Sequence, residues 1–198
     1  DLINQMSSTV CHAPGPARVL DCCLVSNGAV AVIVTSAKRA RDLKQPPVYI
    51  RGFAQGHNHD TGQADHDPYV HTAGALSAPR ALAMAGAKVG DVSQCQIYDC
   101  YTYTVIVTLE DYGFCKKGEG GSFVEGGQLG PGGALPTNTG GGELSSFYMW
   151  GMTPVSEAVI QGRGQGGERQ APNDLIMVSG NGGVLAYHST LVLSPEAA

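Results

Sequence analysis

The sequence predicts an α/β domain with a mixed sheet and packed helices. Three stretches of the 198-residue chain lead to this prediction: an apolar, β-branched run at 29–35, a helical segment APRALAMAGA, and paired strand patterns in LIMVSGNGGVLAYHSTLVLS. Strands that alternate with helical segments along a chain favour this class. A hydrophobic fraction of 42% is large enough for a sizeable core.

The first half of the chain supplies strands and helices in alternation. The run Ala29–Thr35 is continuous and β-branched, which is typical of a buried central strand. Ser36 is expected to cap a short basic helix at 37–43. After a pair of prolines, VYIRGFAQG is expected as the next strand, and APRALAMAGA as a helix that ends near Gly86.

The second half contains one ambiguous segment and one long loop. QCQIYDCYTYTVIVTLEDYGF begins as a strand, but its β-branched residues favour strand while its length suits a helix, so the second part stays open. The glycine-rich stretch Lys116–Gly142 is expected to be a functional or disordered loop. A helix is expected from Thr153 and Pro154, and strands on either side of Ser179–Gly183 predict a closing β-hairpin.

Composition excludes several classes of partner. The net charge of −5 and pI of about 5.6 give no electrostatic reason to expect nucleic acid or an anionic membrane. No apolar run reaches the roughly 18 residues of a membrane helix. The chain begins with Asp1 and has no signal-peptide pattern, which indicates a processed or truncated start.

The cysteines and the histidine-rich loop predict no bound metal. The six cysteines form no CxxC pair and fit no zinc spacing, so we expect reduced thiols and a cytoplasmic location. They are Cys11, Cys22, Cys23, Cys95, Cys100 and Cys115. The stretch HNHDTGQADHD offers imidazole and carboxylate groups, but a solvated loop is the favoured interpretation. GRGQGG follows a helix rather than a strand, so it is not a dinucleotide fingerprint.

The stretch YDCYTYT places Tyr98, Asp99 and Cys100 at the end of an apolar strand. A tyrosine hydroxyl can act as an acid, a base or an oxyanion donor if its pKa, about 10 when free, is lowered. The alternative is that Tyr98, Tyr101 and Tyr103 are sheet residues with polar tips. From these residues alone, both interpretations stay open.

Five ordered motifs resemble the C-terminal half of the thiolase superfamily. LDCCLVSNGAVAVIVTSAKRARDL is similar to the end of the family's N-terminal half, and YDCYT stands at its His-Asp-Cys-Phe-type motif. NTGGGELSSFYMWGMTP is similar to the loop Asn-x-x-Gly-Gly…Gly-His-Pro, QGRGQGGERQ to the helix end after it, and VSGNGGVLAYHSTLVLS to the closing hairpin. The resemblance covers about 19–193 and implies a thiolase-like fold, with 1–46 ending the N-terminal half and 47–198 forming the C-terminal domain.

The departures from the thiolase pattern concern its catalytic groups. Tyr148 stands at the position of the histidine that activates the nucleophilic cysteine, and Ser179 at that of the closing-hairpin cysteine. Tyr98 replaces an asparagine or histidine that helps bind the thioester oxygen, while Cys100 is retained. The nucleophilic cysteine itself belongs to the N-terminal half and is missing here. Without an activated thiolate, the Claisen chemistry of thiolases cannot proceed.

The resemblance is closest to the steroid side-chain-degrading, lipid-transfer-protein type of thiolase-like aldolase, and to the sterol-carrier-protein-type thiolases. It implies retro-aldol cleavage of a β-hydroxyacyl-CoA that releases propionyl-CoA or acetyl-CoA, with no cofactor. Tyr98 and Tyr148 are then the acid/base pair, and Cys100 is a candidate third participant. The implied substrate-binding residues are Asp99, Asn138, Gly141, Gly142, Ser179 and Gly182. Asn138, Gly141 and Gly142 are equally consistent with roles in turns.

The same resemblance implies partners and leaves two alternatives. It implies a homodimer that associates with a small subunit containing an OB-fold and a zinc ribbon. The first alternative is a thiolase or acyltransferase that uses Cys100 as a base and a nucleophilic cysteine from elsewhere. The second is a non-catalytic subunit that only binds an acyl-CoA or acts as a scaffold.

Overall fold

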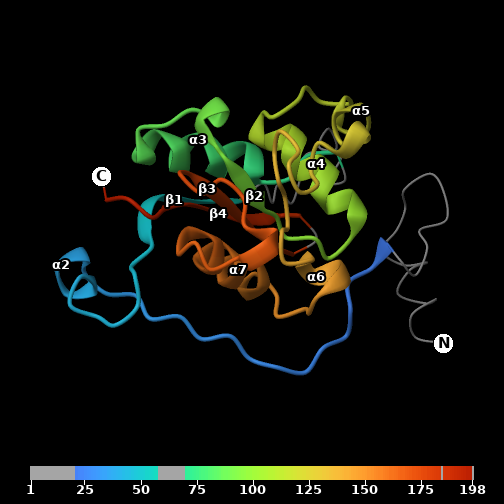
Figure 1. The fold of residues 1–198 in the computed structure, drawn as a ribbon. Coiled ribbons are helices and arrows are strands. Elements are labelled where there is room, and N and C mark those ends of the chain that lie inside the picture. Colours follow the sequence, from blue (N-terminus) through green and yellow to red (C-terminus); the bar gives the residue numbers. More distant parts are fainter. Residues whose placement is uncertain (1–20, 58–69, 184, 198) are drawn as a thin grey trace.

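The computed structural model describes residues 21–57, 70–183 and 185–197, and shows a sheet with helices on both faces (Figure 1). The sheet has four strands in the order β1-β4-β3-β2. These strands are β1 (Tyr49–His57), β4 (Tyr187–Ser194), β3 (Ile176–Gly182) and β2 (Gln94–Gln96). This arrangement confirms the predicted α/β class with a mixed sheet.

The predicted closing hairpin is formed by β3 and β4 at the centre of the sheet. These strands pair antiparallel, β1 pairs antiparallel with the other side of β4, and β2 pairs parallel with β3. The pairing extends to Gly182 opposite Tyr187. The turn therefore follows Gly182 and does not occupy Ser179–Gly183 as the glycines suggested. Ser179 lies within the paired part of β3, where the parallel neighbour β2 ends.

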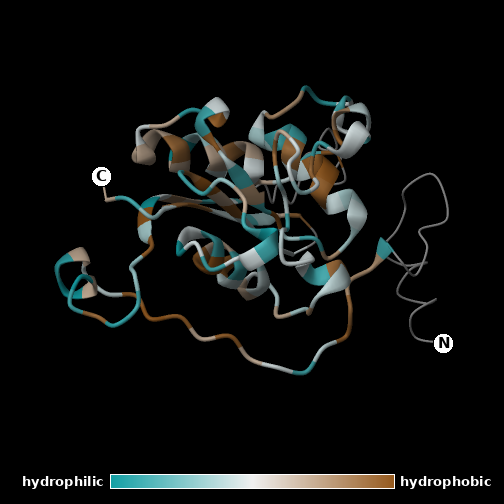
Figure 2. Ribbon diagram, viewed as in Figure 1, coloured by the Kyte–Doolittle hydropathy of each residue, from teal (hydrophilic) through white to brown (hydrophobic). Residues whose placement is uncertain are grey.

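Helices cover both faces of the sheet (Figure 1). On one face lie α3 (Gly74–Ala85), α4 (Thr102–Tyr112) and α5 (Gly120–Phe123); on the other lie α6 (Gly142–Ser145) and α7 (Met152–Gly162). The shorter elements are α2 (Ala37–Ala40), η2 (Val89–Asp91), η3 (Glu125–Gly127) and η4 (Gly167–Arg169). Hydrophobic residues gather along the strands and the helices beside them (Figure 2), and the larger buried cluster lies between the sheet, α3 and α4.

The ambiguous segment forms a helix because packing outweighs its β-branched composition. In α4, Thr104, Val107, Thr108, Leu109 and Tyr112 are buried, and they recur at the three- and four-residue spacing of one helix face. Burial of that face against the core is worth more than the weak intrinsic preference of threonine and valine for strands. The predicted end of α3 is confirmed, since Gly86 caps it in the left-handed conformation at φ 67°.

The predicted central strand at Ala29–Thr35 is wrong. This stretch is extended, but it lies outside the sheet, and Ile33 and Val34 are 89% and 75% exposed. Figure 2 shows its hydrophobic residues on a segment separated from the sheet. An apolar run predicts burial only if a partner surface exists, and the described residues provide none for Val32, Ile33 and Val34. Ser36 does cap α2, accepting from the Arg39 N–H at 3.4 Å, although the helix is shorter than predicted.

The glycine-rich stretch Lys116–Gly142 packs on α4. One oxygen of Glu110 accepts hydrogen bonds from the backbone N–H groups of Gly118 and Gly120, at 3.0 and 2.9 Å. The histidine-rich stretch at 58–69 lies outside the described residues. Within the described ranges, no cluster of three or more His, Cys, Asp or Glu side chains could hold a metal. No described helix is both long and apolar enough to cross a membrane.

Helix α3 lies unusually close to β1 because β1 presents glycines to it. A side chain at Gly52 would collide with the Ala81 carbonyl, and one at Gly56 with the Ala73 carbonyl. Both glycines are buried, and the facing residues of the helix are alanines. Backbone-to-backbone contact of this kind leaves no room for a methyl group.

We predict that Gly52→Ala lowers the free energy of unfolding by about 1–3 kcal/mol, because α3 must shift away from β1. Gly90→Ala is the matched control, since Gly90 is exposed and a side chain there meets nothing within 4 Å. Urea denaturation of both variants measures the difference. Equal midpoints for the two variants would contradict the close packing of α3 on β1.

Candidate active site

The candidate active site lies at the edge of the sheet where the parallel strands β2 and β3 end. Tyr98, Asp99 and Cys100 follow β2 and precede α4, and Ser179 lies on the neighbouring β3. Tyr148 comes from the loop between α6 and α7. In α/β proteins, the carboxyl ends of parallel strands are the usual position of a ligand site.

The two tyrosines identified from the sequence meet at this edge. The hydroxyl oxygens of Tyr98 and Tyr148 are 2.8 Å apart and share a hydrogen bond. Their rings stand edge-on with centroids 6.3 Å apart. Tyr98 is only 5% exposed, while Tyr148 is half-buried. The structure therefore forms one hydroxyl pair from residues 50 positions apart, with Tyr148 nearer to solvent.

Both hydroxyl groups of the pair are neutral phenols in this environment. Burial raises the pKa of Tyr98, and its hydrogen bond to Tyr148 raises it further. Burial also raises the pKa of Tyr148, although the hydrogen bond from Tyr98 acts in the opposite direction. The lowered pKa that a resting phenolate needs is therefore absent. Tyr148 is the easier of the two to ionise, because Tyr98 can donate a hydrogen bond to its oxygen.

Ser179 holds the backbone of Tyr98. Its Oγ accepts a hydrogen bond from the Tyr98 N–H at 2.9 Å, and the residue is 1% exposed. On the other side, Thr104 Oγ1 donates to the Tyr98 carbonyl at 3.0 Å. Ser179 thus positions Tyr98 from the place where thiolases have a cysteine. Its predicted role in substrate binding stays a prediction.

Asp99 organises the glycine loop that leads to Tyr148. Its carboxylate accepts hydrogen bonds from the N–H groups of Glu143 and Leu144, at 2.7 and 3.3 Å, at the start of α6. Gly141 and Gly142 have φ values of 93° and 61°, and a side chain at Gly142 would collide with the Asp99 carboxylate. In the structure these residues therefore shape the loop, which was one of the two roles considered for the glycines.

Two other predicted binding residues also have structural partners. The side chain of Asn138 accepts from the Ile97 N–H at 2.7 Å and donates to the Ile97 carbonyl at 3.0 Å, so it extends the pairing beyond β2. Gly182 lies at the far end of β3, paired with Tyr187. Gly182 lies three positions beyond Ser179 along β3, so the structure does not group Gly182 with the tyrosine pair.

Cys100 lies beside the pair as a neutral thiol. Burial, and then the charge of Glu143, raise its pKa to about 12. Its carbonyl accepts a hydrogen bond from the Cys23 N–H at 2.9 Å, which attaches the N-terminal segment to the site. None of the described cysteines is in a disulfide: Cys22, Cys23, Cys95, Cys100 and Cys115.

Glu143 is a site residue that sequence reasoning missed. Its side chain is fully buried, and within the described part of the chain neither carboxyl oxygen has a hydrogen-bond partner. Burial, followed by the charge of Asp99, raises the pKa of Glu143 to about 9. The signal in the sequence was a single acidic residue inside GGGELSS, next to glycines that leave little room for a long side chain in solvent.

Two cavities flank the glycine loop. One is mostly apolar and has a volume of about 890 Å³. It is bordered by residues 22–30, Tyr101, Tyr148, Met149, Trp150 and Met152. The rings of Trp150 and Tyr148 are stacked with centroids 6.4 Å apart, and Trp150 is 69% exposed. The apolar cavity is therefore bordered by Tyr148, the more exposed residue of the pair.

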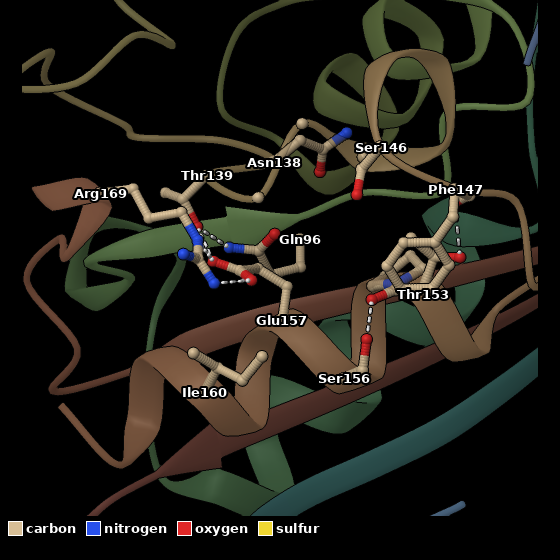
Figure 3. A pocket seen from close by; sticks show the side chains of 14 residues that line it. Gln96, Asn138, Thr139, Ser146, Phe147, Thr153, Ser156, Glu157, Ile160 and Arg169 are labelled. Atoms are coloured by element: carbon tan, nitrogen blue, oxygen red, sulfur yellow. Dashed lines mark hydrogen bonds and ion pairs between the residues drawn. The ribbon is translucent and has the colours of Figure 1, made fainter. Parts of the chain in front are cut away.

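The second cavity, of about 540 Å³, contains a polar network (Figure 3). Figure 3 shows Thr139, Glu157 and Arg169 directed toward one another. Thr139 Oγ1 donates to Glu157 Oε1 at 2.8 Å, and Arg169 Nε donates to the same oxygen at 3.0 Å. The motif QGRGQGGERQ thus anchors the end of α7 to the glycine loop.

The sheet, its two helical layers and the site at the ends of the parallel strands define a thiolase-like α/β protein. A family model described as thiolase C-terminal domain-like matches residues 54–195. The chain belongs to this family, and the resemblance drawn from its motifs is confirmed. The division of the chain at 46 and 47 stays a prediction.

Curated relatives include lyases and acyltransferases. The chain is 39% identical over 177 residues to the 17-hydroxy-3-oxo-4-pregnene-20-carboxyl-CoA lyase of Mycobacterium tuberculosis, covering 85% of this chain and 45% of the relative. It is 36% identical to the steroid side-chain-cleaving aldolase of Thermomonospora curvata, covering 91% and 47%. It is also 34% identical to an acetyl-CoA acetyltransferase of Methanothermobacter thermautotrophicus, covering 92% and 49%.

A solved structure shows the same architecture. The Ltp2-ChsH2(DUF35) aldolase superimposes with a TM-score of 0.84 at 32% identity, covering 96% of this chain and 50% of the matched chain. The present chain thus spans about half the length of the relatives it matches. Activity, substrate and partners of the whole protein are therefore matters for proposal.

We predict that Glu143 makes stability depend on pH. Its pKa is about 9 in the fold against 4.5 as the ordinary value, so between these limits the native state holds a proton that the unfolded state releases. Glu143 contributes most to the free energy of unfolding below pH 4.5. This contribution is lost as the pH rises toward 9, by at most about 1.4 kcal/mol per pH unit. Glu143→Gln removes this dependence.

Denaturant unfolding of the wild type and Glu143→Gln at pH 6 and pH 8 measures the effect. The stability of the wild type relative to the variant is expected to fall by about 2–3 kcal/mol between these values. An unchanged difference would show that the Glu143 carboxyl is ionised in the native protein.

Proposed function

We propose that this chain provides the tyrosine acid/base pair of a thiolase-like aldolase that cleaves a β-hydroxyacyl-CoA. The observation that supports the proposal most strongly is the 2.8 Å contact between the Tyr98 and Tyr148 hydroxyl groups, with Tyr148 at the position of the thiolase histidine. Two of its relatives are named as a steroid acyl-CoA lyase and a steroid side-chain-cleaving aldolase. A carbon–carbon lyase acting on a steroid acyl-CoA is the proposal for the complete protein.

The neutral pair can carry out this reaction as a proton relay. In a retro-aldol cleavage, the β-hydroxyl loses its proton, the bond between the α- and β-carbons breaks, and its electrons pass to an acyl-CoA enolate. Either hydroxyl can donate the shared hydrogen bond. With Tyr148 as the donor, Tyr148 takes the substrate's hydroxyl proton while its own proton moves to Tyr98, and the proton of Tyr98 goes to the α-carbon. The products are a ketone or aldehyde and a shorter acyl-CoA. The relay requires no resting phenolate, which agrees with the raised pKa values of both tyrosines.

The apolar cavity beside Tyr148 suits a bulky hydrophobic acyl group. Met149, Trp150 and Met152 border it, and its volume of about 890 Å³ falls in the range of small-molecule sites. We propose that it receives the hydrophobic part of the substrate. A steroid is the class that the names of the relatives suggest, with propionyl-CoA or acetyl-CoA as the released product.

The thiolase alternative is less well supported. A cysteine acting as a base must be a thiolate, whereas the pKa of Cys100 is raised to about 12. The observation that favours this alternative for the complete protein is the relative named as an acetyl-CoA acetyltransferase. A scaffold role without catalysis would leave the alignment of the two hydroxyl groups unexplained.

The partners belong to the same proposal. The solved relative carries ChsH2(DUF35) in its name, and we propose that a small subunit of this type binds here, with the OB-fold and zinc ribbon that the resemblance implies. A homodimer and a cytoplasmic location are proposed on the resemblance alone. No cofactor is proposed, because the relay accounts for every proton in the reaction.

We predict that Tyr148→Phe and Tyr98→Phe each lower kcat by about 10²–10⁴-fold while the melting temperature changes little. The assay uses the longest polypeptide that contains this chain, with any subunit that co-purifies, and measures ketone release from β-hydroxyacyl-CoAs. Tyr49→Phe is the control, because Tyr49 lies in β1 away from the site. Near-normal turnover in Tyr148→Phe would end the proposal, and a loss confined to Tyr148→Phe would remove Tyr98 from the relay.

A further inference from the structure

Glu143 is buried at the start of α6, where it contacts Asp99, the neighbour of Tyr98. Its side chain has 0% exposure, and both carboxyl oxygens lack a hydrogen-bond partner among the described residues. Its backbone is held on both sides, since the N–H donates to Asp99 Oδ1 at 2.7 Å and the carbonyl accepts from the Leu24 N–H at 3.1 Å. The main chain that carries this buried side chain is therefore fixed on both sides.

The surroundings of Glu143 favour the neutral acid. The titratable groups coupled to it are Asp99, Tyr98, Cys100, Tyr148 and Cys23, from the end of β2, the α6–α7 loop and the N-terminal segment. All of these are acids, and no cationic side chain is among the described groups that act on it. A buried carboxylate without a cation or a hydrogen-bond donor is costly, so the group keeps its proton instead.

We propose that Glu143 is a positioning residue that controls the proton relay: as a neutral acid it permits the relay, and as a carboxylate it blocks it. The effect on turnover rests on the proposed function, but the protonation of Glu143 does not. Retro-aldol cleavage builds negative charge on the enolate and passes a proton between the tyrosines. A second negative charge beside them opposes both changes, because charges interact strongly in a site with little water.

The pKa values of the neighbours agree with this coupling. The charge of Glu143 is among the causes that raise the pKa of Tyr98, Tyr148 and Cys100. Glu143 itself titrates near 9, below the tyrosines, so it is the first of these groups to lose its proton as the pH rises through the alkaline range. The alkaline limit of activity therefore belongs to Glu143 and not to the tyrosine pair.

The protonation of Glu143 can be tested without any activity. Infrared difference spectra of the longest polypeptide, wild type minus Glu143→Gln, are expected to show the C=O stretch of a protonated carboxyl group at pH 7. Glu125→Gln is the control, because Glu125 is exposed. If the wild type and Glu143→Gln show the same protonated-carboxyl signal at pH 7, the proposal is overturned. A positive spectrum from a protein that cleaves no acyl-CoA would overturn the proposed function instead.

The control of the relay is tested by the pH dependence of kcat. Between pH 7 and pH 10, kcat of the wild type and of Glu125→Gln is expected to fall about tenfold, because about one tenth of a group with a pKa of about 9 is still protonated at pH 10. Glu143→Gln keeps its kcat within about threefold over that range, since the amide carries no charge. An identical alkaline decline in Glu143→Gln would show that another group sets the limit.

A second uncharged variant keeps the test valid if Glu143→Gln fails to fold. Glu143→Met has a similar volume and no charge, and replacing an unpaired buried carboxyl by an apolar group is expected to preserve or raise stability. It should therefore show the same flat alkaline profile as Glu143→Gln. A loss of kcat at pH 7 with KM unchanged in both variants would overturn the positioning role and show that the carboxyl proton itself takes part in the reaction.

Discussion

The candidate site depends on the Asp99 carboxylate, which joins the segment after β2 to the glycine loop. It accepts the first N–H groups of α6, and Gly142 leaves room for it to do so. This one contact brings Tyr98, which precedes Asp99, to the same place as the loop that carries Glu143 and Tyr148. Together with the hydrogen bonds of Asn138 and Thr139, it holds a glycine-rich loop in one conformation, although glycine has the largest conformational entropy to lose.

The site that results is a cluster of neutral acids. Two phenols, the Cys100 thiol and the Glu143 carboxyl all have raised pKa values, chiefly because they are buried. Such a cluster cannot supply the thiolate that Claisen chemistry requires. It can pass protons between fixed positions without a change in net charge, which is what a retro-aldol cleavage demands. The exchange of the thiolase histidine for Tyr148 therefore accompanies a change in the electrostatic character of the whole site.

The sequence predicted elements whose signals are local. The hairpin of β3 and β4, the end of α3 at Gly86 and the start of α7 all depend on glycine, proline and periodic patterns within a few residues. The tyrosine pair was predicted through motif order. The exposure of the run Ala29–Thr35 was not predicted, because hydrophobicity reveals an apolar surface but not its partner. Glu143 was missed since its burial comes from tertiary contacts, and Ser179 and Asn138 gained backbone partners that no pattern encodes.

The most direct measurement of the central claim is the requirement for free CoA. The longest polypeptide that contains this chain is incubated with a β-hydroxyacyl-CoA bearing a bulky apolar chain, and the products are quantified by mass spectrometry. An aldolase with the tyrosine relay releases the carbonyl compound and the shorter acyl-CoA in equal amounts without added CoA. Cleavage that occurs only on β-ketoacyl-CoAs, and only when free CoA is present, would contradict the account and identify a thiolase.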